Sequence, residues 1–555
     1  MRVHDPPWVP ARPGYEVEVF ATGFQLPVDI AFVPDPGDQP GDPFFYVSEL
    51  YGTIAVVTRD GSVSDYATGL LNYSPSGAFP GSGEQGLTGL AVDPATGDVY
   101  ASMLQQTQSP FGNPNVPRVD RFVSFDGGLT AAVRTKVIDF PGETQGQSHQ
   151  ISNLTIHPDG TLLVHMGDGF DASTAQDLSS YRGKILRMQL SGAAAPTNPF
   201  YDLADGVDAR DYVWASGVRN PFGGDRRAAD GLQYEVENGP SVDRFGQVTA
   251  GRDFGWNGTN GSMLNFALHT WNPATGPVDL AFVQPETFGG SGFPASVQGH
   301  AFVTLSGPTY AQGPQANGKR IEEFVLDAAG NLIQGPIPFL EYAGDGRATA
   351  VGLAAGPDGL YFTDLYKDQN AAGPTDPGAN VLRVRHVGLT DCNGNELEDA
   401  CEIAQGLVLD LDGNGVPDDC LAPALSGSPL QVSLAGGGVQ DLTLNADPAL
   451  AGAPYLLLGS SSGTEPGLAV DGLTLPLNFD TYLAHTLANP NTPPLAGSLG
   501  VLGAGGTAAA SLTIPAATSS SLAGVQLNHA YLAFDASGVP SAVAASNAVP
   551  LLLLP

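Results

Sequence analysis

The sequence has little positive charge, few charged residues of any kind and hardly any cysteine. Lysine and arginine number 22 against 57 aspartates and glutamates, so the formal net charge is -35, and only 14% of the residues are charged. A surface this acidic repels phosphate backbones and anionic lipids, which argues against binding to nucleic acid or to a membrane surface. The acidity is compatible with a secreted protein that binds calcium.

Long apolar segments are also missing. The first residues, MRVHDPPWVPARPGYEVEVF, contain no apolar signal-peptide core, and the lightly charged stretch 496–527 is interrupted by Gly, Ser, Thr and Pro. We therefore expect no transmembrane segment. We expect a secreted, periplasmic or cell-surface protein whose export signal is not visible in this sequence.

The three cysteines, Cys392, Cys401 and Cys420, fall in one short stretch, and the first 391 residues have none. This distribution indicates a local disulfide cross-link rather than general redox chemistry. A Cys392–Cys401 bridge would leave Cys420 free, and the other pairings stay open.

Glycine and proline are abundant, with 72 and 46 residues, and 42% of the chain is hydrophobic. This combination favours an all-β protein with many tight turns over a disordered chain. Every Lys and Arg lies at or before Arg385. The shift in composition places a boundary near 388–421 and divides the chain into three parts, 14–388, 391–420 and 422–555.

The first part repeats a simple unit, in which an apolar strand enters a Pro-Asp or Asp-Gly turn and a second apolar strand follows. Such turn residues supply the backbone angles of tight hairpins. Units spaced about 60 residues apart are typical of four-stranded blades with long loops, so we predict a six-bladed β-propeller over 14–388. The repeats are PVDIAFVPD…FFYVSELYGTIAVV (27–57), LTGLAVDPATGDVYASM (87–103), ISNLTIHPDGTLLVHMGD (151–168) and VGLAAGPDGLYFTDLY (351–366).

The second part is a tandem pair, DCNGNELEDAC and DLDGNGVPDDC. Oxygen side chains that alternate around a glycine turn are the ligands Ca²⁺ prefers. The pattern resembles thrombospondin type 3 and dockerin-like calcium loops, although a solvated Asp/Asn/Gly-rich linker would have a similar composition. The predicted ligands are Asp391, Asn393, Asn395 and Asp399 in the first loop and Asp410, Asp412, Asn414 and Asp418 in the second.

The third part, 422–555, alternates short apolar runs with Gly, Ser and Thr, as in YLLLGSSSG and HAYLAFDASG. This alternation predicts a small β-sandwich. It resembles the C-terminal modules of many exported bacterial proteins, and we expect it to stabilise the protein or attach it to the cell surface.

One hairpin of the first part carries a candidate catalytic pair. His149 comes just before one strand, and Asp168 ends the next strand after the turn at 157–160. Because the two ends of a hairpin meet, Asp168 can reach His149 and orient its ring, and an oriented histidine can take a proton from a hydroxyl group. The alternative is a surface histidine beside a turn aspartate, which is a common arrangement.

Five segments of this part resemble, in the same order, the glucose/sorbosone dehydrogenase family, whose members use pyrroloquinoline quinone (PQQ). The resemblance covers about residues 15–388. No single motif is specific, but five in order are much stronger than any one. The segments are GSGEQGLTGLAVDP (81–94), SHQISNLTIHPDGTLLVHMGDG (148–169), VWASGVRNPFG (213–223), VENGPSVDRFGQVTAGRDFGWNG (236–258) and GRATAVGLAAGPDG (346–359).

The resemblance implies a catalytic role for His149 as base, for Asp168 as its partner and for Arg219 at the quinone oxygen. A planar guanidinium suits both the carboxylates of PQQ and a developing oxyanion. The alternative for this arginine is that it joins two loops. Asn220 beside it and Arg347 in the last blade match PQQ contacts of the family.

The family also implies a Ca²⁺ that polarises PQQ, held by backbone carbonyls that match Gly239 and Pro240. Carbonyl ligation suits Ca²⁺ and leaves no side-chain signature. The sequence departs from the family after this dipeptide. A single Asp243, followed by Arg244, replaces the usual acidic pair, and in the run GRDFGWNG (251–258) Asp253 and Phe254 replace an Asn-Tyr pair of the family.

A few further residues are interpreted with less specific support. Glu84 matches a Gln or Glu near the substrate in the family, although an exposed glutamate in a Gly-rich loop is usually only solvated. Some members of the family have a lysine that contacts the cofactor. Lys319 is the candidate for it here, although its distance in sequence from the other motifs matches the family poorly. His165 is interpreted as a packed strand residue, and Trp214 and Trp256 as propeller core or loop anchors rather than stacking platforms.

The sequence therefore predicts PQQ- and Ca²⁺-dependent oxidation of a sugar or other alcohol hydroxyl, by hydride transfer to the quinone. The chain has no Cys-x-x-Cys-His haem motif, so the electrons would leave to an external acceptor, and no phosphate-cradling glycine loop for a nicotinamide cofactor. One rival is a lactonase-type hydrolase, whose central Ca²⁺ is held by carboxylate and Asn side chains. A second rival is a non-catalytic propeller that binds glycan or protein.

Overall fold

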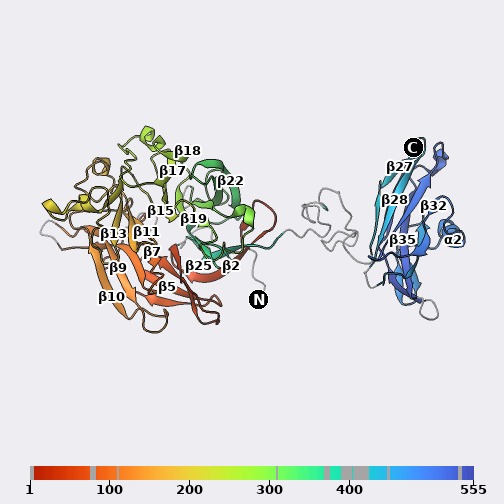
Figure 1. The fold of residues 1–555 in the computed structure, drawn as a ribbon, viewed down its shortest axis with the longest axis horizontal. Helices are drawn as coiled ribbons and strands as arrows, with labels where there is room; N and C mark the ends of the chain where they lie inside the picture. The colour runs from red at the N-terminus through yellow and green to blue at the C-terminus, as the bar shows by residue number, and fades with distance from the viewer. Residues whose placement is uncertain are drawn as a thin grey trace. The chain divides into compact units, whose positions relative to one another are not determined.

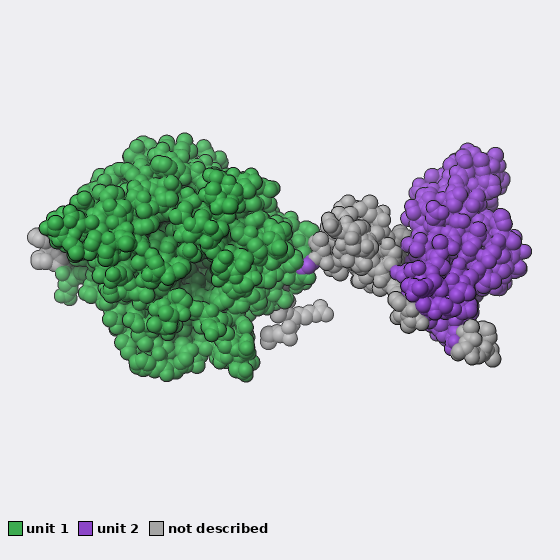
Figure 2. Space-filling view, viewed as in Figure 1, with its two compact units in different colours: residues 1–387 green, residues 388–555 purple. Residues whose placement is uncertain are grey.

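The computed structural model divides the chain into two compact units, residues 1–387 and 388–555 (Figure 2). We describe each unit by itself. The predicted calcium loops (391–401 and 410–420) and the three cysteines lie outside the described residues, so they stay predictions. The structure describes residues 6–75, 83–108, 112–307, 311–367, 375–388, 403, 424–446, 450–535 and 541–555.

The first unit contains six antiparallel sheets, each the blade of a propeller (Figure 1). The first three blades follow the chain from the innermost strand outward. They are β3 (Pro27–Phe32), β4 (Pro43–Glu49), β5 (Thr53–Thr58) and β6 (Val63–Ala67); β7 (Leu87–Val92), β8 (Val99–Gln106), β9 (Asn115–Val123) and β10 (Val133–Asp139); and β11 (Ile151–Ile156), β12 (Thr161–Met166), β13 (Lys184–Gln189) and β14 (Val213–Ser216).

The other three blades complete the circle, and two N-terminal strands join the last two of them. The blades are β15 (Gly223–Arg226), β16 (Gln233–Glu237), β17 (Asp243–Val248) and β18 (Ala267–Trp271); β19 (Pro277–Val283), β20 (His300–Leu305), β21 (Arg320–Leu326) and β22 (Leu332–Tyr342) with β1 (Trp8–Pro10); and β23 (Ala350–Gly356), β24 (Gly359–Asp364) and β25 (Ala379–His386) with β2 (Tyr15–Phe24).

The predicted six-bladed β-propeller is confirmed. The innermost strands β3, β7, β11, β15, β19 and β23 each contact the next, and β23 contacts β3, so the ring closes. Strand β2 pairs with β25 from Tyr15 opposite His386 to Phe24 opposite Ala379, which ties the two ends of the unit into one sheet. The unit begins earlier than the predicted residue 14, because Trp8 pairs with Tyr342 and is almost fully buried.

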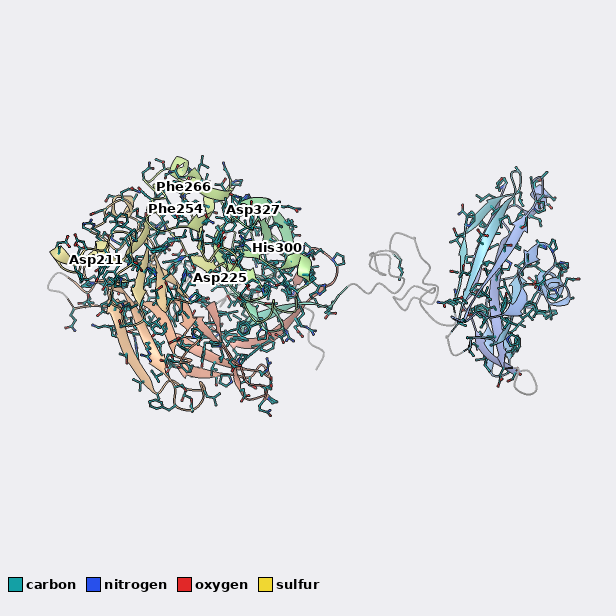
Figure 3. The ribbon with its side chains drawn as sticks, in the orientation of Figure 1. Asp211, Asp225, Phe254, Phe266, His300 and Asp327 are labelled. Atoms are coloured by element: carbon teal, nitrogen blue, oxygen red, sulfur yellow. The ribbon has the colours of Figure 1, made fainter. Side chains whose placement is uncertain are left out.

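Three buried aspartates connect neighbouring blades, and each is the third residue of an inner strand. Asp29, Asp225 and Asp279 each accept the N–H of the following residue with one carboxylate oxygen. The other oxygen accepts an N–H from the inner strand of the next blade, at 2.7 to 2.9 Å. Burial raises the pKa of Asp29 to about 7 and that of Asp225 to about 6. Figure 3 labels Asp225 near the middle of the unit.

The second unit is also almost entirely β-structure in its described residues and has two large sheets and one two-stranded sheet. The two large sheets share one hydrophobic core, formed by Leu442 and Leu512 from one sheet and by Leu457, Tyr531 and Leu551 from the other. The sheets are β26 (Ala424–Ser428), β28 (Gly438–Asn445), β34 (Thr507–Ile514) and β32 (Leu495–Ala496); and β27 (Gln431–Ser433), β37 (Val549–Leu554), β35 (Gln526–Asp535), β29 (Pro454–Ser460) and β33 (Leu499–Val501), with β36 (Ser541–Ala545) beside β35.

Helical structure is sparse in the described residues. The helix α2 (Thr481–Ala488) begins at Asp480, whose carboxylate accepts the N–H of Leu483 as an N-cap. No helix in the described residues is long and apolar enough to cross a membrane. The remaining elements are the hairpin β30 (Leu468–Val470) and β31 (Leu473–Leu475), and the 3₁₀ turns η1 (Ala172–Ala175), η2 (Leu203–Asp205), η3 (Ala209–Tyr212), η4 (Asn260–Leu264), η5 (Ala295–Val297) and η8 (Ser520–Leu522).

Candidate active site

His149 lies in the loop that leads into β11, the inner strand of the third blade, with its side chain only 4% exposed. Its φ of 58° is in the left-handed region that non-glycine residues rarely adopt. Two hydrogen bonds hold this backbone in place, because its N–H donates to Glu84 at 2.9 Å and its carbonyl accepts from Gly169 at 3.1 Å. Strained backbone that its surroundings maintain in this way is common at functional sites.

Asp168 follows β12 and meets His149 across the end of the hairpin, as predicted. Its Oδ1 lies 2.6 Å from Nδ1 of His149, and its Oδ2 accepts from the indole N–H of Trp256 at 2.8 Å. The backbone N–H of Phe170 also donates to Oδ1. A buried carboxylate at Nδ1 favours the tautomer with the proton on Nδ1, which leaves the lone pair on Nε2 as the proton acceptor.

Gly167 allows this close approach of hairpin end and loop. A Cβ at Gly167 would lie 2.4 Å from the backbone carbon and oxygen of His149, far inside van der Waals contact. The strand end and the His149 loop can therefore pack only around a glycine.

If His149 is the base that the sequence predicts, Gly167→Ala lowers kcat/KM by about 100-fold, because displacing the imidazole by about 1 Å disturbs the geometry of proton transfer. The melting temperature should fall by only a few degrees. Gly146→Ala is the matched control, since a Cβ at Gly146 meets nothing within 4 Å. Equal activity of the two variants, measured in a dye-reduction assay, would contradict the role of this contact.

Arg219 is joined to the same group through backbone and side chain. The carbonyl of Arg219 accepts the N–H of Asp168 at 2.7 Å, and its Nη1 donates to the carbonyl of Asn238 at 2.6 Å. The guanidinium carbon lies 5.7 Å from the ring of Trp256, within cation–π range. Burial lowers the pKa of Arg219, while the nearby Asp168 opposes that shift. A half-buried cation of this kind can bind an anionic ligand.

Asn220 connects the arginine loop to the second blade. Its amide donates to Glu84 Oε1 at 3.1 Å, while the other oxygen of Glu84 accepts from His149. The Oδ1 of Asn220 is buried and has no hydrogen-bond partner among the described residues. Such an atom is costly to leave unpaired and can accept from a ligand.

The loop at Gly239 and Pro240 lies directly after β16, beside Asn238. Neither carbonyl accepts a hydrogen bond from the described part of the chain, so the donor set fits a hard cation. The N–H of Gly239 donates to the Asp243 carboxylate at 2.9 Å, and this hydrogen bond holds the loop in place. A Cβ at Gly239 would lie 1.9 Å from the carbonyl oxygen of Val242, so this tight loop also needs a glycine.

The departure from the family after Gly239-Pro240 has a structural reason. Asp243 is buried and accepts three backbone N–H groups, those of Gly239, Thr275 and Gly276. The side chain of Arg244 is fully buried and pairs with Glu237 at 2.7 Å. Glu237 in turn accepts the N–H of Arg219 at 3.1 Å.

Asp243 therefore holds the Gly239 loop, and Arg244 holds the Glu237 side chain that accepts the Arg219 N–H. Burial and the adjacent Glu237 raise the pKa of Glu235, which lies next to this pair, well above its usual range.

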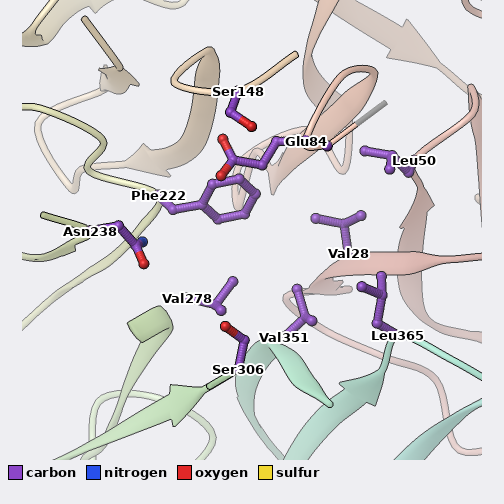
Figure 4. A pocket seen from close by; sticks show the side chains of 11 residues that line it. Val28, Leu50, Glu84, Ser148, Phe222, Asn238, Val278, Ser306, Val351 and Leu365 are labelled. Carbon is purple, nitrogen blue, oxygen red and sulfur yellow. The ribbon is translucent and has the colours of Figure 1, made fainter. Parts of the chain in front are cut away.

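A cavity of about 200 Å³ opens beside these loops, at the starts of the inner strands (Figure 4). One part of its wall is apolar and another carries polar groups, an arrangement common in small-molecule sites. Its lining is Val28, Leu50, Phe222, Val278, Val351 and Leu365 on the apolar part, and Gly83, Glu84, Ser148, Asn238 and Ser306 on the rest.

Three further residues named in the sequence analysis come from other segments of the unit. Arg347 is half-buried in the loop between the fifth and sixth blades that leads into β23. Lys319 is buried, and its ammonium donates to the carbonyls of Ala311 and Gly313. His165 is fully buried, and burial lowers its pKa to about 4, which agrees with a packing role.

Sequence reasoning missed the contact of Phe170 and one contact of Trp256. Trp256 is buried in a small core cluster, as predicted, and its indole N–H in addition donates to the Asp168 carboxylate. The ring of Phe170 stacks on the imidazole of His149. The only sequence signal for them is proximity to matched motifs, because Phe170 follows MGDG and Trp256 ends GRDFGW.

The fold and the site define a six-bladed β-propeller with a His–Asp pair and a half-buried arginine beside a cavity at the starts of the inner strands. The family model described as glucose/sorbosone dehydrogenase matches residues 24–307, about half of the chain. The chain belongs to the glucose/sorbosone dehydrogenase family.

Individual relatives resemble parts of the chain. A protein of Synechocystis sp. is 30% identical over 252 residues, which are 42% of this chain and 57% of that protein. The aldose sugar dehydrogenase of Escherichia coli strain K12 is 29% identical over 110 residues, 20% of this chain and 29% of the enzyme. In both cases the match spans less than two thirds of the relative.

A solved structure covers the propeller more fully. An oxidoreductase of Thermus thermophilus, described as a glucose dehydrogenase, is 27% identical with a TM-score of 0.50. The alignment covers 67% of this chain and 99% of that one.

Proposed function

We propose that the propeller unit oxidises a hydroxyl group of a sugar or other alcohol, with PQQ and Ca²⁺ as cofactors. The observation that carries the proposal is the oriented histidine: Asp168 holds Nδ1 of His149 at 2.6 Å, and Trp256 holds the other oxygen of that carboxylate. Family membership supports the same chemistry.

His149 acts as the general base. Nε2 takes the proton of the substrate hydroxyl, while the carbon-bound hydrogen leaves with the two electrons that the oxidation removes. The imidazolium that forms is stabilised by the buried Asp168 carboxylate, and Trp256 keeps that carboxylate in place. Proton transfer contributes about 10² to 10⁴ in rate in enzymes of this kind.

PQQ would be held by Arg219, Asn220 and Arg347, with Glu84 near the substrate, and Ca²⁺ by the carbonyls of Gly239 and Pro240. PQQ supplies an electron-accepting quinone that Ca²⁺ polarises. The half-buried guanidinium of Arg219 suits a carboxylate or quinone oxygen, and the unpaired Oδ1 of Asn220 offers an acceptor. The apolar part of the cavity wall suits a flat ring system.

The wider setting is also proposed. The electrons pass to an external acceptor, and the protein works outside the cytoplasm as a secreted, periplasmic or cell-surface enzyme. The C-terminal unit attaches or stabilises it, and the loops at 391–420 bind further Ca²⁺.

The three buried aspartates of the inner strands favour this proposal over a lactonase-type hydrolase. In such a hydrolase, side-chain oxygens at the centre of the propeller hold Ca²⁺. Here Asp29, Asp225 and Asp279 lie there, and both oxygens of each accept backbone N–H groups. Carboxylates engaged in this way stabilise the ring and are poor candidates for a metal site.

The experiment is reconstitution of the metal-depleted full chain with PQQ and Ca²⁺, followed by a screen of aldoses and alcohols with an artificial electron acceptor. We expect turnover only when both cofactors are present. Lactone hydrolysis without PQQ would favour the hydrolase, and the absence of any spectral change on adding PQQ with Ca²⁺ would favour a binding module.

The same assay tests Arg219. We predict that Arg219→Gln raises the PQQ concentration needed for half-maximal activity at least tenfold, because a charge-assisted contact of about 1.4 kcal/mol or more is lost. Arg210→Gln is the matched control, since this arginine is exposed on η3 in the third blade. Equal PQQ requirements for the two variants would remove Arg219 from the cofactor site.

A further inference from the structure

A second cavity lies between the fourth and fifth blades, and none of its lining residues lines the cavity beside Glu84 and Asn238. Its volume is about 270 Å³, close to the lower end of the range of small-molecule sites, which is about 300 to 1,000 Å³. One wall is the outer strand β18 with the loop that follows it. The other wall is strand β21 with the loop that precedes it.

The hydroxyl of Thr275 in this cavity lacks a partner. Thr275 is 8% exposed, and its buried Oγ1 has no hydrogen-bond partner among the described residues. The backbone at this point is held in place, because the N–H groups of Thr275 and Gly276 donate to Asp243 at 2.7 and 2.9 Å. A buried hydroxyl without a partner costs free energy of folding, and a polar group of a ligand would supply the missing hydrogen bond.

The imidazole of His269 offers two more polar atoms in the same cavity. Its ring packs edge-on against Trp271, with centroids 4.8 Å apart, and neither ring nitrogen forms a hydrogen bond with the described residues. Burial lowers the pKa of His269, so the ring is neutral at neutral pH and presents one N–H donor and one acceptor. The indole N–H of Trp271 is already used, because it donates to Glu322 at 2.9 Å.

The charges in the cavity wall offset one another. Arg320 and Glu322 are the charged side chains of the lining, and Nη1 of Arg320 lies 3.9 Å from Oε1 of Glu322. The hydroxyl of Thr275 and the amides of Asn272 and Asn317 can each donate and accept hydrogen bonds. An anion needs an excess of donors and a metal ion an excess of oxygen acceptors, whereas the hydroxyls of a neutral polyol use both kinds of group.

We propose that this cavity is a non-catalytic binding site for a single neutral saccharide unit. Thr275 and His269 bond its hydroxyl groups, and the edge of the Trp271 indole packs against its C–H groups. The unit belongs either to a free sugar or to the end of a glycan chain, since both present the same ring hydroxyls. The occupied site retains the propeller on carbohydrate whether or not PQQ is bound, so this inference does not rest on the proposed function.

The test is calorimetric titration of the full chain, before PQQ is added, with methyl glycosides of glucose, galactose and mannose and with maltotriose, cellotriose and mannotriose. Thr275→Val removes the unpaired hydroxyl and keeps the shape of the side chain, so we expect an unchanged or higher melting temperature. The same variant should raise the Kd of the bound saccharide by about tenfold or more, and so should His269→Phe. His149→Asn and Thr22→Val, an exposed threonine of β2, should bind as wild type does.

The two kinds of probe distinguish the sources of the saccharide unit. Tighter binding of a trisaccharide identifies the end of a glycan chain, and equal affinities identify a single unit. Because no PQQ is present, the result is independent of whether the reconstituted chain oxidises anything.

Three outcomes would overturn the inference. The first is a folded wild type that binds none of these saccharides. The second is binding that Thr275→Val and His269→Phe leave unchanged and His149→Asn abolishes, which would place the sugar at the oxidation site. The third comes from inorganic phosphate and Ca²⁺ as charged probes, since binding of either that is lost in Thr275→Val would make the cavity an ion site.

Discussion

Replacing His149 with asparagine should lower kcat by about 10³-fold while leaving the fold and PQQ binding intact. The expected size is that of a lost general base. Asparagine is the informative replacement, because the φ of 58° at this position is strained for most residues and asparagine tolerates it. His149→Ala should lose as much activity with a larger loss of stability.

The control for this variant is His157→Asn, which changes a half-buried histidine in the turn at the opposite end of the same hairpin. It should keep wild-type kcat. Steady-state dye reduction measures the rates, and PQQ titration followed by absorbance confirms that the cofactor still binds. Unchanged turnover in His149→Asn would remove the residue from the catalytic machinery.

Replacing Asp168 with asparagine should lower kcat by about 10² to 10⁴, with little change in KM. The loss of charge removes the partner that stabilises the imidazolium formed on proton uptake. The new amide also conflicts with the site, because Asp168 accepts from His149 Nδ1 on one oxygen and from Trp256 on the other. One of these donors must then face an NH₂ group.

Trp256→Phe is the matched comparison, since it removes one donor to the carboxylate and keeps the charge. We expect a fall in kcat of about tenfold, which corresponds to about 1.4 kcal/mol. If Asp168→Asn were no worse than Trp256→Phe, the carboxylate would serve only to pack the loop, and the orientation of the base would need another explanation.

The propeller was predictable because its local signals agree along the chain. Turns such as His157-Pro158-Asp159-Gly160 separate apolar strands, and each predicted hairpin is present. The pairing of β1 with β22 was not predictable, since Trp8 and Tyr342 lie far apart in the sequence and a strand as short as β1 carries no periodic pattern. Long-range pairing of short strands leaves no local mark in a sequence.

The contact of His149 with Asp168 was predictable for the same reason as the fold, because the two residues are the two ends of one hairpin. The link from Trp256 to Asp168 spans 88 positions and joins different blades, so no spacing rule reveals it. The contact of Phe170 with His149 was missed because it depends on a positive φ and on ring stacking, which composition and periodicity do not encode. The meaning of Arg244 likewise required its buried partner Glu237.

The most direct test of the account is anaerobic mixing of the PQQ- and Ca²⁺-loaded chain with an aldose in the absence of an electron acceptor. The spectrum of the bound quinone reports its reduction in a single turnover. We predict stoichiometric reduction by wild type and a rate about 10³-fold lower in His149→Asn at equal PQQ occupancy. Reduction at the wild-type rate in His149→Asn, or no reduction in a fully loaded wild type, would contradict the account.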